Sequence, residues 1–91
     1  MNTLFSLGRI VATPGALGAF ERANQSPAIF LARHVGGDWG ELDQAGVAEN
    51  EYSMGHSFPL LSSYTTAAGE KVWIITEPDR SMTTLLLPDE Y

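Results

Sequence analysis

Residues 33–41 bring together several side chains that could do chemistry. They place a cation, an imidazole, a carboxylate and an indole beside three glycines, in the order RHVGGDWGE. Histidine can move a proton during phosphodiester cleavage, and arginine can stabilise the charge of a phosphate. His34 and Arg80 are therefore candidate catalytic residues. Tyr64 and Thr83 are candidates for positioning a substrate.

Structural roles are the favoured explanation for the two charged candidates. His34 is expected in the last turn of a helix, where a positive imidazolium is attracted to the helix dipole. Arg80 follows two acidic residues, Glu77 and Asp79, either of which is a suitable partner for an ion pair. These alternatives favour a chain without catalytic activity.

No residue pattern in the chain specifies a metal or a cofactor. The absence of cysteine excludes a disulfide framework, thiolate catalysis and a cysteine-based zinc site. His34, Asp38 and His56 could gather a divalent metal, but their spacing carries little information. Gly36-Gly37 follows a helix, whereas a phosphate-binding loop precedes one. We therefore predict no cofactor and no resident metal.

Trp39 is the aromatic residue of most interest for binding. Its indole either packs over the helices as part of the core or projects from the surface as an anchor for a partner protein. In the second case Arg33, Asp38 and Glu41 would surround it with charge. These four residues form the predicted binding set.

The charge distribution indicates whether a nucleic acid or a protein is the expected partner. The chain has a formal net charge of −6, and no Lys or Arg occurs between His34 and Glu70. Nucleic-acid binding depends on neutralising phosphates with Lys and Arg, so this acidic stretch argues against a DNA or RNA partner. A basic protein surface is a better match. A solvated acidic face that only aids solubility is the alternative.

The length of 91 residues, of which 44% are hydrophobic, fits one domain over residues 1–91. So small a domain has limited stability, and a homodimer joined through the N-terminal or C-terminal strand is a further hypothesis. The first five residues lack the features of a signal peptide, and no apolar run approaches the roughly 18 to 20 residues that span a bilayer. We expect a soluble, cytoplasmic protein without membrane attachment.

Two dipeptides mark the starts of helices. Thr13-Pro14 and Ser26-Pro27 each join an N-cap residue to the residue best suited to the first helical position. They predict helices over 14–23 and 27–35, and Gly36-Gly37 ends the second.

A weaker third helix is expected between Glu41 and Ser53. It begins either with a capping box formed by Asp38 and Glu41 or with Asp43 as its N-cap. Gly46 makes this helix marginal.

Apolar runs bounded by turn residues predict strands in the remaining parts of the chain. The predicted strands are 4–12, with a bulge at Gly8, then 60–66, 70–76 and 82–87. Strand, two or three helices and three further strands make an α+β fold with two layers. Its sheet is four-stranded and mainly antiparallel, with the helices on one face.

Five segments carry a resemblance to known proteins, and they are 11–17 (VATPGAL), 33–42 (RHVxGDWGEL), 61–64 (LSSY), 72–84 (VWIITExDRSxTT) and 86–91 (LLPxEY), where x is a position that does not contribute. Through these segments the sequence resembles a family of small bacterial proteins encoded on plasmids and integrative elements. The resemblance implies a mobile-element setting and confers no known activity. Residues 45–57 depart from the more charged pattern of the family. The order of elements also resembles RelE-type toxins and barnase-like ribonucleases, in topology alone.

Two functions follow as hypotheses. The first is a non-enzymatic module that binds and modulates a protein of the host or of the mobile element. The second is a metal-independent ribonuclease or toxin-like protein that uses His34 and Arg80.

Overall fold

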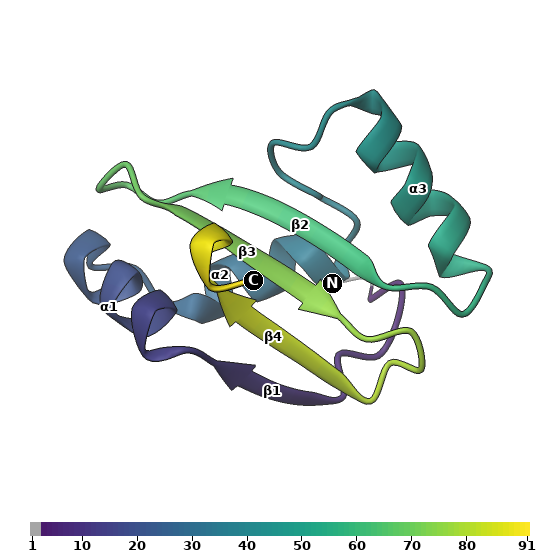
Figure 1. The fold of residues 1–91 in the computed structure, drawn as a ribbon, viewed down its shortest axis with the longest axis horizontal. Helices are drawn as coiled ribbons and strands as arrows, with labels where there is room; N and C mark the ends of the chain where they lie inside the picture. The colour runs from purple at the N-terminus through teal and green to yellow at the C-terminus, as the bar shows by residue number, and fades with distance from the viewer. Residues whose placement is uncertain (1–2) are drawn as a thin grey trace.

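The computed structural model describes residues 3–91, which fold into a four-stranded sheet with three α-helices (Figure 1). The elements follow in the order β1 (Arg9–Ala12), α1 (Pro14–Ala23), α2 (Pro27–Val35), α3 (Gln44–Met54), β2 (Leu60–Thr65), β3 (Lys71–Thr76), β4 (Met82–Leu86) and the short 3-10 helix η1 (Pro88–Glu90). The predicted α+β class with a four-stranded sheet is confirmed.

The first two helices begin and end where the sequence predicts. The Thr13 hydroxyl accepts a hydrogen bond from the Ala16 N–H at 3.0 Å, and proline follows it at the first helical position. The Ser26 hydroxyl does the same for α2 by accepting from the Ala28 N–H at 3.2 Å. These caps satisfy amide groups that have no partner within the helix. Gly36 ends α2, as predicted.

The third helix starts at the second of the two predicted positions. The Asp43 carboxylate accepts a hydrogen bond from the Gly46 N–H at 2.8 Å and is the N-cap of α3. The alternative capping box of Asp38 and Glu41 is wrong. Asp38 instead accepts from the Gly40 N–H and pairs with Arg33, which fixes it to the turn after α2.

The strands lie in the order β1-β4-β3-β2. The pairs β2/β3 and β3/β4 are antiparallel, and β1 pairs with β4 in parallel, so the sheet is mixed but mainly antiparallel. This order puts β4 inside the sheet and β1 and β2 at its edges. The C-terminal strand is therefore not an edge strand as the dimer hypothesis supposed, whereas the N-terminal strand is.

The first strand is shorter than predicted and does not include residues 4–8. Gly8 adopts a left-handed φ of +63°, and a Cβ atom at this position would overlap the backbone of Arg80 and Ser81 in the turn between β3 and β4. Instead of extending the sheet, the segment before Gly8 turns toward α2. There the Leu4 N–H donates to the Val35 carbonyl oxygen at 2.8 Å.

The hydrophobic core lies between the sheet and the first two helices. Its buried members come from α1, α2 and the three C-terminal strands, and they are Ala16, Ala19, Phe20, Phe30, Tyr64, Val72, Ile74 and Leu85. Alternate residues of β3 are buried, as expected for a strand with one face against helices. The helix η1 lies in front of the opposite face in Figure 1.

The outer edge of β2 is covered by two separate pieces of chain. The Glu41 N–H donates to the Ser63 carbonyl oxygen at 2.7 Å, and the Ser63 N–H donates to the Trp39 carbonyl oxygen at 3.1 Å. Two residues earlier on β2, the Asn50 side-chain amide donates to the Leu61 carbonyl oxygen at 2.6 Å and accepts from the Leu61 N–H at 3.1 Å. A side chain of α3 thus takes the place of a neighbouring strand.

Gly40 and Gly69 offer a matched test of this edge. Both have a left-handed φ, of +75° and +86°, but a Cβ at Gly40 would overlap the Ser63 carbonyl oxygen, whereas one at Gly69 would meet no atom within 4 Å. We expect Gly69→Ala to lower the free energy of unfolding by about 1–2 kcal/mol through backbone strain. Gly40→Ala should lose roughly a further 1–3 kcal/mol through overlap. Equal losses in urea denaturation would contradict this packing.

Candidate functional site

A buried chain of hydrogen bonds runs from His34 through three hydroxyl groups. His34 Nδ1 lies 2.5 Å from Ser62 Oγ, and its Nε2 lies 2.9 Å from Thr76 Oγ1. Thr76 Oγ1 lies 2.7 Å from Thr83 Oγ1, which donates to the Leu7 carbonyl oxygen at 2.7 Å. All four side chains are buried. We call this set the His34 chain.

The acceptor at one end of the His34 chain fixes the direction of its hydrogen bonds as far as His34 Nε2. Because the Leu7 carbonyl can only accept, the Thr83 hydroxyl donates to it and must accept from Thr76. Thr76 then accepts from an N–H at His34 Nε2. One imidazole proton is therefore on Nε2, and in a neutral ring Nδ1 accepts from the Ser62 hydroxyl.

The surroundings of His34 oppose its protonation. Burial lowers the pKa of His34 from 6.5 to about 4, because the charged imidazolium would lose its hydration. An additional proton on Nδ1 would also face the Ser62 hydroxyl, which donates to that atom in the neutral form. His34 does not act as a positive cap of α2, as the structural alternative supposed.

Two aromatic rings enclose His34. The Phe5 ring meets the imidazole edge-on at 5.2 Å between centroids, and the Trp39 ring does so at 5.7 Å. Phe5 and Trp39 also stack on each other at 6.1 Å. Trp39 is only 5% exposed, so its interpretation as a projecting anchor is wrong and the core-packing alternative is confirmed.

Arg80 binds backbone carbonyl groups. Its Nη1 donates to the carbonyl oxygens of Phe58 at 2.7 Å and Glu77 at 3.1 Å, and its Nη2 donates to that of Ser53 at 2.7 Å. The expected ion pair with Glu77 or Asp79 is absent among the described residues, and the Glu77 contact is made by the backbone. Arg80 thereby ties the end of α3 to the β3–β4 turn.

The catalytic candidates do not converge in an open cleft. His34, Thr83 and Tyr64 are buried, and the Phe5 ring lies between His34 and Arg80, with the Arg80 guanidinium 5.9 Å from its centroid. A proton shuttle must come within hydrogen-bond reach of its substrate. This geometry favours structural roles for His34 and Arg80 over the ribonuclease hypothesis.

The structure brings together three other predicted residues, namely Arg33, Asp38 and Tyr64. Arg33 Nε donates to Asp38 Oδ2 at 2.7 Å, and the guanidinium lies 4.5 Å from the centre of the Tyr64 ring. The Tyr64 hydroxyl donates to the Asp38 carbonyl oxygen at 2.6 Å. The Arg33 guanidinium holds the pKa of the Asp38 carboxyl below its usual range, and burial raises the pKa of Tyr64 to about 12.

Glu41, the last of the predicted binding residues, is exposed beside β2. A hydrogen bond from Thr65 and the nearby Lys71 ammonium hold the pKa of the Glu41 carboxyl below its usual range. Lys71 Nζ lies 3.5 Å from Glu41 Oε1. Glu41 therefore already has a cationic neighbour within the chain.

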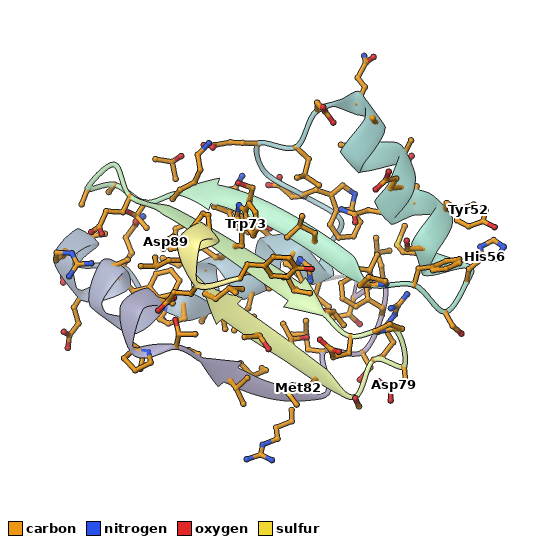
Figure 2. The ribbon with its side chains drawn as sticks, viewed as in Figure 1. Tyr52, His56, Trp73, Asp79, Met82 and Asp89 are labelled. Carbon is orange, nitrogen blue, oxygen red and sulfur yellow. The ribbon has the colours of Figure 1, made fainter. Side chains whose placement is uncertain are left out.

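Sequence reasoning missed an aromatic patch at the end of α3, formed by Tyr52, His56 and Phe58. The Tyr52 and His56 rings stack at 3.9 Å with 7° between their planes, and the Phe58 ring lies 5.9 Å from that of Tyr52. Figure 2 shows Tyr52 and His56 together at the outer end of α3. Four residues separate them, a spacing that brings side chains together on a helix, but His56 lies in the turn after α3, so helical spacing alone does not predict this stack.

Among residues 3–91, no group of three or more His, Asp or Glu residues is placed to hold a metal ion. Both ring nitrogens of His34 already have hydroxyl partners. No helix in the same range is long and apolar enough to cross a membrane.

Comparisons with protein-family models, with curated proteins and with solved structures give no match to this chain.

The buried neutral state of His34 predicts a loss of stability in acid. Because the pKa of His34 is lowered on folding, its contribution is complete above pH 6.5, declines as the pH falls below that value and is lost below about 4. The loss should approach about 3 kcal/mol. We expect His34→Gln to flatten this pH dependence in urea denaturation. His56→Gln is the matched control, and an equal flattening in that variant would contradict the assignment.

A valine substitution tests the contribution of the Thr83 hydroxyl to stability, because valine keeps the shape of threonine without the hydroxyl. Thr83→Val leaves the Leu7 carbonyl without its donor and the Thr76 hydroxyl without its acceptor, so we expect a loss of about 1–3 kcal/mol in the free energy of unfolding. Thr84→Val, on the other face of β4, is the matched control and should change stability little. Similar losses in both variants would show that the His34 chain is not the cause.

Proposed function

We propose that this protein is a non-enzymatic module that binds a partner protein with a basic surface. The observation that carries the proposal is the orientation of α3. Its buried residues, Asn50 and Ser53, are polar, whereas Tyr52 is 57% exposed. A helix that serves only the fold usually turns its apolar side toward the core.

Polar contacts account for the attachment of α3 to the rest of the domain. Asn50 binds the β2 edge through Leu61, and the Ser53 carbonyl accepts from Arg80. The aromatic patch is therefore not needed to hold the helix in place. Exposed aromatic side chains grouped in this way are typical of protein interfaces.

The charges around the aromatic patch support a basic partner. Glu49 and Glu51 are exposed on α3, and no Lys or Arg occurs in the sequence between Arg33 and Lys71. Such a surface attracts a positively charged protein and repels nucleic acid. The resemblance to proteins of plasmids and integrative elements supports a partner from the host cell or the element.

A photo-reactive phenylalanine analogue tests the proposal when it replaces Tyr52, with replacement of Ile29 on α2 as the control. Both positions are at least half exposed. We expect irradiation in the native host to link a partner protein at position 52, with a yield that falls as salt is raised in lysates. Absence of an adduct at position 52, or the same adducts at both positions, would contradict the proposal.

A further inference from the structure

A shallow hollow of about 470 Å³ lies beside the aromatic patch, between α3 and the start of β2. Its walls come from two separate segments and are Ala48, Glu49, Tyr52, Ser53, Phe58 and Pro59. The lining includes two aromatic residues, a proline and the acidic residue Glu49. We call it the α3 hollow.

The carboxylate in the α3 hollow has no cationic partner among the described residues. The ion pairs of the described residues involve other acids, and none includes Glu49. Arg80 is not among the residues that line the hollow, but its guanidinium donates to the carbonyl oxygens of two of them, Phe58 and Ser53, both at 2.7 Å. Arg80 thus binds backbone carbonyl groups of the wall and forms no ion pair with Glu49.

The Tyr52 ring of the hollow already has a stacking partner before any ligand arrives. His56 Nδ1 donates to the Tyr52 carbonyl oxygen at 2.7 Å, and the His56 ring stacks on that of Tyr52. The backbone of Phe58 is bound by Arg80, which donates to its carbonyl oxygen. Side chains that are ordered in advance lose less entropy on binding.

We propose that the α3 hollow binds an arginine side chain from a basic segment of the partner, an inference that rests on the proposed function for the source of that segment. The planar guanidinium stacks on the rings of Tyr52 and Phe58 and forms hydrogen bonds with the Glu49 carboxylate. The aliphatic part of the arginine packs against Ala48 and Pro59. Arginine suits this site better than lysine because its planar group can stack and pair at the same time.

Short end-blocked peptides with one variable central residue provide the test. The residue is arginine, lysine, norleucine or citrulline, and citrulline keeps the shape of arginine without its charge. In a titration followed by amide NMR shifts, we expect the arginine peptide to shift signals of residues 48–53 and 58. The citrulline peptide should bind about tenfold more weakly. Equal binding by citrulline, lysine or norleucine would overturn the arginine assignment.

Two variants separate the hollow from general charge attraction. Glu49→Gln should weaken binding of the arginine peptide about tenfold. Glu51→Gln, which removes the same charge from an exposed residue outside the hollow, should leave most of it. Equal effects would overturn the proposal. Both residues are exposed, and a thermal melt of each variant confirms that the fold is kept.

The result of the peptide-binding experiments can be interpreted independently of the crosslinking result at Tyr52. Capture of a partner at position 52 without binding of the arginine peptide would overturn the arginine site and leave the proposed function standing. Specific binding of the arginine peptide, lost in Glu49→Gln, would support the arginine site even if no partner is captured.

Discussion

The hydrogen bonds of the buried His34 ring join parts of the chain that are far apart in sequence. Through Ser62, Thr76 and Thr83 they connect α2 to β2, β3 and β4, and the last bond reaches the segment before β1. Each hydroxyl needs its neighbour, because an unpaired polar group in the core is costly. The relative positions of helix and strands are therefore set by one polar network as well as by apolar packing.

The fold and the proposed binding surface are connected through α3. Asn50 and the carbonyl of Ser53 hold this helix by directional polar bonds, so its position does not depend on burying aromatic side chains. Tyr52 and its neighbours can then face outward without weakening the attachment. The buried residues of α3 are polar, whereas those of α1 include the apolar residues Ala19 and Phe20.

Local signals predicted the elements, whereas contacts between distant residues determined the site. Thr13-Pro14 and Ser26-Pro27 mark helix starts within a few residues, so both helices follow from the sequence. The partners of His34 lie 28 and 42 residues away, and no local pattern identifies them. The sequence did not decide whether the Trp39 indole is buried or exposed, because the ring that stacks on it belongs to Phe5, which lies in a segment predicted as a strand. The parallel pairing of β1 with β4 is equally non-local.

Because the edge of β2 is covered, β1 is the edge strand through which the sheet can pair with another chain. Asn50 and residues 39–41 occupy the hydrogen-bonding groups of Leu61 and Ser63, while β1 has no second neighbouring strand among residues 3–91. A chain with two open edges can add copies at both and form fibrils. When β1 is the one open edge, pairing of two copies through β1 leaves neither copy with an open edge. Association by strand pairing would therefore stop at a closed pair.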